Sequence, residues 1–338
     1  EYEDLNPNVE IEFVQLAFND EADMKLVTAL MSGESVDVYT PTRNHYDKIT
    51  SGLALELTDF LEKDGIVLEE EIGPGVSEWT FNDKHYAIPT YTFSSIFFLN
   101  QEMFQEAGLE FPSFDWTMSD YQELASKLTK GQGSAKQYGA YITSNWKYFW
   151  LYPYFRSFRE ADIFNEDFTE SNFNDPAIVK ALELYIKMSE EDGSIPTFSE
   201  TVAEKYFPNQ MYLGEKAAMV LSQDYLLRSI KDRQKYPHSY KTGFVELPRD
   251  PAFNKDYRLY NISGPTIINP KSKNIDASWE FLKWFFHDGC KHVAALSGKL
   301  PSYKGFSAEE VTQFMVEGSE DLIDFDTFEK IYAARMDD

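Results

Sequence analysis

The sequence predicts an α/β fold made of two lobes, with mostly parallel sheets. Segments with helical and strand periodicity alternate along the whole chain, which is typical of helices packed on parallel sheets. The chain has 338 residues, more than one hydrophobic core usually supports, so we expect two lobes. Hydrophobic residues make up 43% of the chain and aromatic residues 16%, which is enough to form both cores.

The chain begins with a predicted strand, helix and strand. Apolar and polar residues alternate over 9–14, as in a half-buried strand. A helix then runs from its cap at Asp20 to Gly33, and a short buried strand follows at 36–39. Four apolar residues of this helix are expected to face the core: Met24, Val27, Leu30 and Met31.

Later elements carry local start and stop signals. Thr117 and Asp120 form a capping box before a helix, and Asp175-Pro176 is typical of the first two positions of another. The strand at 95–99 is nearly all apolar, so we expect both of its faces to be buried. The other strands are expected at 85–88, where Pro89 ends the strand, and at 217–221, 243–247 and 260–268.

Charge and cysteine content exclude several classes of protein. Lys and Arg number 31 and Asp and Glu number 57, so the net charge is −26, which repels nucleic-acid phosphates. We therefore expect no nucleic-acid partner. The one cysteine, Cys290, excludes an intrachain disulfide and a zinc site built on several thiolates, and we expect it to be buried.

Targeting signals are absent from the sequence itself. It contains neither a signal peptide nor a run of the ~18 apolar residues that cross a bilayer. The first eight residues are typical of a helix end that runs into a turn. We therefore expect a processed or trimmed chain, with a segment missing upstream of Glu1.

Catalytic and metal-binding motifs are also absent. The sequence has no nucleophile elbow, no phosphate-binding or dinucleotide-binding glycine loop and no zinc-protease motif, and its five histidines are scattered. Residues 165–171 carry oxygen ligands at alternate positions, but Glu170 stands where a calcium loop needs glycine. We expect no catalytic residue, no metal and no cofactor.

Seven segments occur in an order that is typical of one protein family. The most specific begins with Tyr86-Ala87-Ile88-Pro89 and continues through Phe98-Leu99-Asn100 to Ala107-Gly108-Leu109. The segments are residues 3–9, 25–38, 52–60, 86–117, 214–219, 273–282 and 298–302. In this order they resemble the extracellular solute-binding proteins of family 1, the type that serves bacterial sugar ABC transporters. The sequence departs from the family pattern at Val36, where proline is usual, and at Gln101, where lysine is common.

The resemblance implies a two-lobed periplasmic-binding-protein-like fold of type II, with hinge crossings near residues 90, 247 and 300. The N-terminal lobe then comprises residues 1–90 and 248–300, and the C-terminal lobe comprises 91–247 and 301–338. The family has one strand and most of a helix upstream of the position of Glu1, so these are expected to be missing.

The resemblance also implies the function. It describes a receptor of an ABC importer that binds a mono- or oligosaccharide in the cleft between its lobes and closes around it. The expected partners are this small molecule and a membrane permease, and the chain is expected to be a monomer that is not an enzyme. Its expected place is extracellular, either lipid-anchored at the cell surface, as in Gram-positive members, or periplasmic.

Candidate ligand-binding residues lie in the loops that follow strands, because ligands of open α/β sheets bind at the carboxyl ends of the strands. Thr40, Arg43 and Asn44 follow the strand at 36–39, and Arg43 can hold hydroxyls or a carboxylate through two hydrogen bonds. Tyr91 follows Pro89 at the first expected crossing.

Aromatic residues supply the main indication of sugar binding, because flat rings stack on the CH faces of a pyranose. In the aromatic segment at 146–155 we expect Trp146 and Tyr148 to face the ligand. After the strand at 217–221, Tyr225 is the principal candidate, at a place where the family often has a stacking ring. The remaining candidates are Gln223, Asp224, Tyr260, Asn261 and Ser263, the last beside Gly264.

Two alternatives remain open. The same fold could bind a polyamine, which suits the net negative charge. A secreted carbohydrate-active enzyme would instead need two carboxyl groups facing each other at roughly 5–9 Å.

Overall fold

The structure is a computed structural model that describes residues 1–17, 19–32, 36–41, 45–143, 153–154, 163–165, 169–253 and 260–336. The chain forms two compact units. Unit 1 comprises Glu1–Phe93, Asn261–Ala294 and Lys299–Ser307, and unit 2 comprises Ser94–Tyr260, Ala295–Gly298 and Ala308–Asp338. Residues 248–260 thus belong to unit 2, whereas the sequence placed them in the N-terminal lobe, and residues 301–307 belong to unit 1.

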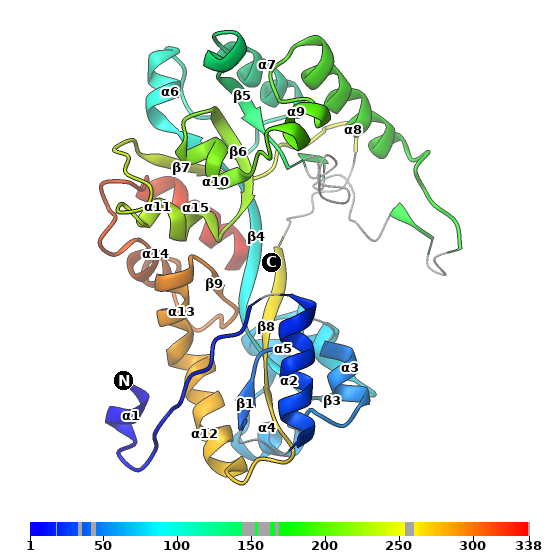
Figure 1. Ribbon diagram of the computed structural model, residues 1–338, viewed down its shortest axis with the longest axis vertical. Helices are drawn as coiled ribbons and strands as arrows, with labels where there is room; N and C mark the ends of the chain where they lie inside the picture. Colours follow the sequence, from blue (N-terminus) through cyan, green and yellow to red (C-terminus); the bar gives the residue numbers. More distant parts are fainter. Residues whose placement is uncertain are drawn as a thin grey trace. The chain divides into compact units, whose positions relative to one another are not determined.

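Unit 1 is a small α/β assembly (Figure 1). Its described helical segments are α1 (Tyr2–Leu5), α2 (Asp20–Ser32), α3 (His45–Thr50), α4 (Thr58–Asp64), α5 (Leu68–Glu71), the 3₁₀ turn η1 (Pro74–Trp79), α12 (Ile275–Trp284), the π-helical turn η6 (Phe285–Gly289) and the start of α13 (Cys290–Ser297). Its described strands are β1 (Val38–Tyr39), β2 (Thr80–Phe81), β3 (Lys84–His85), the first part of β4 (Ile88–Asn100), β8 (Tyr260–Ile268) and β9 (Leu300–Pro301).

The sheet of unit 1 is covered on both faces. Its strand order is β1-β8-β4, with β9 also paired to β4. Ile267 of β8 packs with Leu30 of α2, while the next residue, Ile268, packs with Trp279 of α12. Because successive strand residues point to opposite faces, α2 and α12 lie on opposite sides of this sheet.

Unit 2 is larger. Its described helical segments are α6 (Gln101–Glu106), α7 (Met118–Leu128), the 3₁₀ turn η2 (Gly133–Ala135), α8 (Pro176–Ile186), the π-helical turn η5 (Lys187–Glu191), α9 (Phe198–Ala203), α10 (Pro208–Leu213), α11 (Leu226–Lys231), α14 (Ala308–Val316) and α15 (Phe325–Met336). Its described strands are the second part of β4, β5 (Tyr138–Tyr141), β6 (Ala217–Gln223) and β7 (Thr242–Val245).

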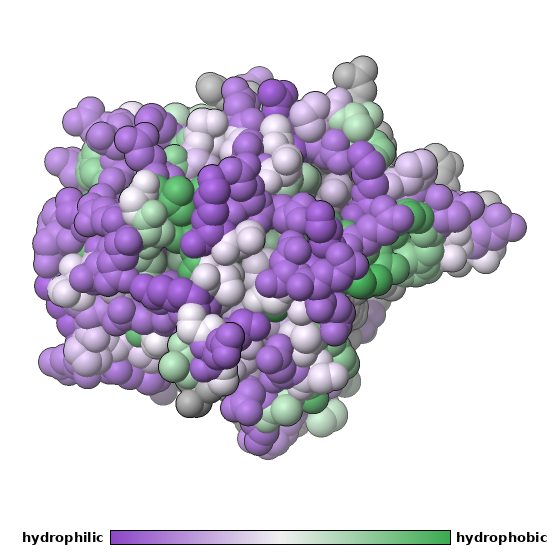
Figure 2. All heavy atoms as spheres, turned by 90° about the horizontal axis from the view of Figure 1, so that it is seen from above, coloured by the Kyte–Doolittle hydropathy of each residue, from purple (hydrophilic) through white to green (hydrophobic). Residues whose placement is uncertain are grey.

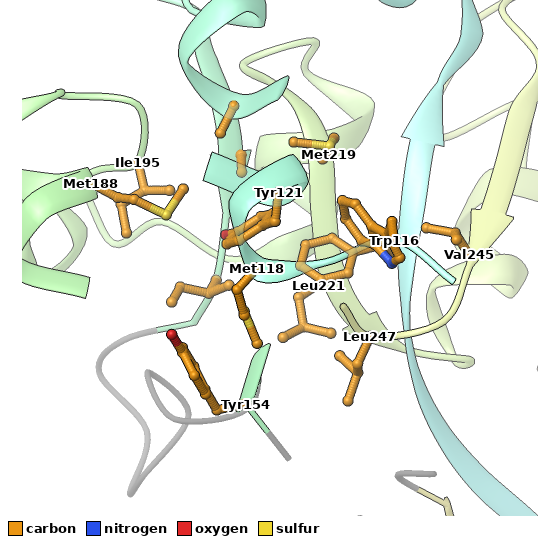
Figure 3. Close-up of a cluster of buried hydrophobic side chains, with 14 of the residues drawn as sticks. Trp116, Met118, Tyr121, Tyr154, Met188, Ile195, Met219, Leu221, Val245 and Leu247 are labelled. Carbon is orange, nitrogen blue, oxygen red and sulfur yellow. The ribbon is translucent and has the colours of Figure 1, made fainter. Parts of the chain in front are cut away.

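The core of unit 2 forms around β4. Phe97 faces Trp116 and Tyr121, with ring centroids 5.4 and 5.2 Å away. Phe98 faces the other side, where Phe244 lies 5.4 Å away. Both faces of this strand are therefore buried, as its apolar sequence predicts. Figure 3 shows the first of these clusters, in which Trp116 and Tyr121 pack with Met219 and Leu221 of β6.

The local signals predicted two helix starts correctly. Thr117 and Asp120 form the expected capping box at α7, and Asp175 caps α8 with Pro176 at its first position. Cys290 is buried, as expected.

The mixed α/β class is confirmed, but the expectation of mostly parallel sheets is wrong for the ladders whose register is described. Only β5 and β6 pair in parallel among them. The pairs β1–β8, β4–β6, β4–β7 and β4–β9 are antiparallel. Most of these ladders involve β4, which belongs to both units. It pairs with strands from much later in the sequence, and these strands run antiparallel to it.

Three local expectations also fail. Residues 9–14 form no strand, and Phe13 in this segment is 81% exposed. In α2 the buried positions are Ala22, Leu26 and Leu30, while Met24 and Met31 point outward. Pro89 does not end a strand, because β4 continues through it.

Within the part of the chain that the structure describes, no helix combines the length and the hydropathy that a membrane span requires.

Candidate functional site

The parallel pair β5 and β6 defines a candidate site in unit 2. Tyr141, the last residue of β5, lies opposite Val220 of β6, and β6 continues to Gln223, so both strands have their carboxyl ends on the same side of the sheet. Ligands of α/β sheets bind at such carboxyl ends. Thr143 follows β5, Ser222 and the partly exposed Gln223 close β6, and Tyr225 stands immediately before α11.

Two aromatic rings lie at this end of β6. Tyr225 is partly exposed, and its ring centroid is 6.4 Å from that of Phe207, with 33° between the planes. Phe207 is 37% exposed and immediately precedes α10. The pair presents flat apolar surface to solvent.

The tyrosine hydroxyls here are neutral. Burial raises the pKa of Tyr225, and Ser222 and Arg228 oppose this shift in part. Burial also raises the pKa of Tyr141, whose hydroxyl donates to the backbone oxygen of Tyr206 at 2.9 Å. At neutral pH this site therefore offers rings and uncharged hydroxyls rather than phenolates.

Asp224 lies between Gln223 and Tyr225 but is only 5% exposed. Its Oδ2 accepts the backbone N–H of Ser94 at 3.0 Å. Its own N–H donates to the backbone oxygen of Ser94, also at 3.0 Å. This carboxylate thus holds neighbouring backbone.

A second candidate site lies in unit 1, around Tyr91 of β4. Its ring lies directly on the backbone of Gly264 in β8, where a Cβ atom would be 2.2 Å from Tyr91 Cε1. Gly264 also has φ +66°, a conformation that favours glycine. The ammonium of Lys299 lies 3.8 Å from the Tyr91 ring centroid and 4.8 Å from that of Phe93, which is a cation–π arrangement.

The structure places the predicted residues in three groups. Gln223, Asp224 and Tyr225 lie at the end of β6, and Tyr91 lies against Gly264 with Ser263 beside it in β8. Thr40 follows β1 and is exposed. Arg43, Asn44, Trp146 and Tyr148 lie outside the described residues, and for Tyr260 and Asn261 only the backbone in β8 is described. The predicted cleft between lobes stays a prediction.

Sequence reasoning missed the partners of these residues. Phe207 precedes α10 and is separated from Tyr225 by that helix and β6, and Lys299 precedes β9, far along the chain from Tyr91. A phenylalanine followed by proline and a lysine after glycine carry no local functional signal. Only the fold brings them to Tyr225 and Tyr91.

The described ranges contain no metal-binding cluster. Nowhere in them do three or more His, Cys, Asp or Glu side chains form a group that could hold a metal ion. One histidine–carboxylate contact joins His287 Nε2 to Glu71 Oε2 at 2.7 Å, and the His287 Nδ1 atom faces the backbone oxygen of Lys283. This pair joins η6 to α5 in unit 1.

Comparison with known proteins identifies related chains. A protein of Brucella abortus (strain 2308) that is named as a binding protein is 22% identical to this chain over 290 residues. The aligned region covers 84% of this chain and 66% of that protein. The chain thus spans slightly less than two thirds of that relative's length.

Solved structures share the fold. The structure of a sugar transporter of Rhizobium etli, in an open conformation, superposes with a TM-score of 0.78 at 20% identity, covering 97% of this chain and 81% of that one. The ABC substrate-binding protein Lmo0181 of Listeria monocytogenes, in complex with cycloalternan, gives a TM-score of 0.69 at 20% identity, with 98% and 88% covered.

The family assignment rests on the match over most of the sequence. Residues 1–289 fit the family described as bacterial extracellular solute-binding protein. Given this match, and the periplasmic-binding-protein-like fold of its structural neighbours, the chain belongs to the bacterial extracellular solute-binding proteins.

Proposed function

We propose that this chain is the solute-binding receptor of an ABC importer and that its ligand is a mono- or oligosaccharide. The observation that carries the proposal is the uncharged aromatic site at the end of β6, where Tyr225 and Phe207 lie together. Sugars need flat apolar surface for their CH faces and a few hydroxyl or amide groups for their own hydroxyls. The amide of the partly exposed Gln223 supplies such a group at the same end of the sheet.

The charges near both candidate sites favour a neutral ligand over a polyamine. The Asp224 carboxylate accepts a backbone N–H, and its side chain is largely shielded from solvent. In unit 1 the Lys299 ammonium lies over Tyr91, where it would repel a polycation. The net charge of −26 thus does not concentrate in the described parts of these sites.

The neighbours support the same ligand class. The Rhizobium protein is named a sugar transporter, and the Listeria protein binds cycloalternan. As a receptor, the chain would release its ligand unchanged to a membrane permease.

We also propose an extracellular location, lipid-anchored or periplasmic, and a monomeric state. Figure 2 shows that hydrophilic residues cover most of the face drawn, with hydrophobic side chains gathered in smaller patches. Together with the net charge of −26, such a surface favours a dispersed monomer, while the match to an extracellular family supports the location.

The test is a thermal-shift screen of the wild type against mono- and oligosaccharides, with Tyr225→Ala as the site variant. A saccharide at 100 times its Kd stabilises the folded protein by about 2.7 kcal/mol. Loss of a stacking ring should weaken binding about 2- to 12-fold, from ~0.5–1.5 kcal/mol per aromatic contact.

Tyr236→Ala is the matched control, because Tyr236 is a partly exposed tyrosine of unit 2 in the loop after α11. It should bind the saccharide as the wild type does. Equal weakening by both substitutions would contradict the placement of the site, and stabilisation by no saccharide would contradict the ligand class.

A further inference from the structure

We propose that Asp224 is a positioning residue for ligand binding. Within unit 2 it positions two residues at unit boundaries, Ser94 and Gly298, each of which is joined in the chain to a residue of unit 1. The inference rests on the proposed receptor function. It gives Asp224 a role through the backbone, in place of the direct ligand contact that the sequence suggested.

The first point is Ser94, which directly follows the last residue of the first segment of unit 1. The antiparallel ladder of β4 and β6 ends with Ser95 opposite Gln223. Asp224 extends the pairing by one residue: its N–H donates to Ser94 O and its Oδ2 accepts Ser94 N–H, both at 3.0 Å. Both residues are buried, so these hydrogen bonds are shielded from water.

The second point is Gly298, after which Lys299 begins the last segment of unit 1. Gly298 has φ +75°, and a Cβ atom there would be 2.8 Å from Asp224 O and 2.9 Å from Leu227 Cβ. Only glycine lets the backbone approach Asp224 this closely.

The residues before Gly298 are hydrogen-bonded to α11, the helix that follows Asp224 and Tyr225. The ammonium of Lys231, at the end of α11, donates to Ala295 O at 2.9 Å and to Met315 O at 2.7 Å. Residues 295–298 are thus hydrogen-bonded at one end to Lys231, the last residue of α11, and packed at the other end against the backbone of Asp224, just before the first turn of that helix.

Asp224 is also flanked in the chain by the candidate ligand contacts Gln223 and Tyr225. A ligand that orders these two side chains also restrains the backbone of Asp224. Asp224 in turn is hydrogen-bonded to Ser94 and packs against Gly298. The position therefore links the proposed sugar site of unit 2 to the chain segments that lead into unit 1.

The test compares Asp224→Ala with Asp224→Asn by hydrogen–deuterium exchange without any ligand. Asn keeps a carbonyl oxygen that can accept the Ser94 N–H, whereas Ala leaves that buried donor without the Asp224 side chain. We expect exchange in peptides covering residue 94 and residues 296–299 to rise about tenfold or more in Asp224→Ala and to stay near wild type in Asp224→Asn.

Asp232→Ala is the matched control, because Asp232 is an exposed carboxylate of unit 2 whose Oδ1 accepts the backbone N–H of Lys235 at 3.1 Å. It should leave both peptides unchanged. Unchanged exchange at residue 94 or at 296–299 in Asp224→Ala would overturn the positioning role.

Gly298→Ala keeps the carboxylate and crowds the Asp224 backbone oxygen, so it decides the case even if Asp224→Ala does not fold. Faster exchange at residue 94 as well as at 298 supports the proposal that Asp224 positions both segments. Faster exchange at 298 alone overturns it.

Calorimetric titration with maltotriose separates this role from a ligand contact. Asp224→Ala should weaken binding about tenfold, while Asp224→Asn should bind within about threefold of wild type. Equal loss of affinity in both variants would indicate that the Asp224 carboxylate contacts the ligand directly, and it would overturn the inference. Failure of the wild type to bind any saccharide counts against the proposed function alone, and the exchange pattern then decides the role of Asp224.

Discussion

Gly264 allows a sharp test of how the candidate site of unit 1 is built. The Tyr91 ring occupies the space that a side chain at 264 would take, since a Cβ atom would lie 2.2, 2.4 and 2.7 Å from three of its ring atoms. Gly264→Ala should therefore force the Tyr91 ring away from β8 and disturb its contact with the Lys299 ammonium.

The magnitude follows from a comparison with Gly52. Gly52 and Gly264 have nearly the same positive φ, +67° and +66°, but a Cβ atom at 52 would meet nothing within 4 Å. The cost of an alanine at positive φ, ~1–2 kcal/mol, therefore applies to both substitutions. Overpacking against Tyr91 should add about 1–3 kcal/mol at 264 alone.

Urea unfolding of the two variants measures this difference directly. We expect Gly264→Ala to be less stable than Gly52→Ala by about 1–3 kcal/mol, and the double variant Gly264→Ala/Tyr91→Ala to recover most of the gap. Equal stability of the two single variants would refute the close packing of Tyr91 on β8.

Two further predictions concern a site residue and a surface ion pair. Phe207→Ala should weaken saccharide binding about 2- to 12-fold in a calorimetric titration, because it removes one ring beside Tyr225; unchanged affinity would remove Phe207 from the site. Hydrogen bonds from Lys283 and Trp279 hold the pKa of Asp64 below its ordinary value. Its stabilising contribution should therefore be present above the ordinary Asp pKa of ~3.9 and be lost as the pH falls through the lower folded-state pKa. The unfolding free energy of Asp64→Asn should consequently fall less on acidification below about pH 4 than that of the wild type, and parallel pH profiles would contradict this assignment.

Local sequence signals predicted those parts of the fold that depend on local hydrogen bonds. The capping box at Thr117 and the Asp175-Pro176 start of α8 involve groups two or three residues apart, so the sequence alone determines them. The burial of both faces of residues 95–99 was equally predictable, because a nearly all-apolar strand has no face suited to water.

Pairing between segments far apart in the chain could not be predicted from the sequence in this way. Pro89 lacks a backbone donor, yet β4 continues through it, and its carbonyl accepts the Ser302 hydroxyl from a segment more than 200 residues later. The alternating pattern at 9–14 gave no strand, since no ladder in the described residues includes this segment.

The same limit applies to the site. Tyr225 was predicted as a ligand contact because it follows a strand, where α/β sheets bind ligands, and because the family that the sequence resembles often has a stacking ring there. Its neighbour Phe207 precedes a different helix, and the Lys299 ammonium over Tyr91 comes from a distant segment, so only the fold reveals these contacts. Asp224 shows the opposite case, because its position suggested a ligand contact while its hydrogen bonds lead to the backbone of Ser94.

The most direct test of the central claim is a calorimetric titration of the wild-type chain with a panel of saccharides and, in parallel, with spermidine and putrescine. The receptor that we propose should bind at least one saccharide saturably with one-to-one stoichiometry and should bind neither polyamine. Binding of a polyamine with no saccharide bound would contradict it.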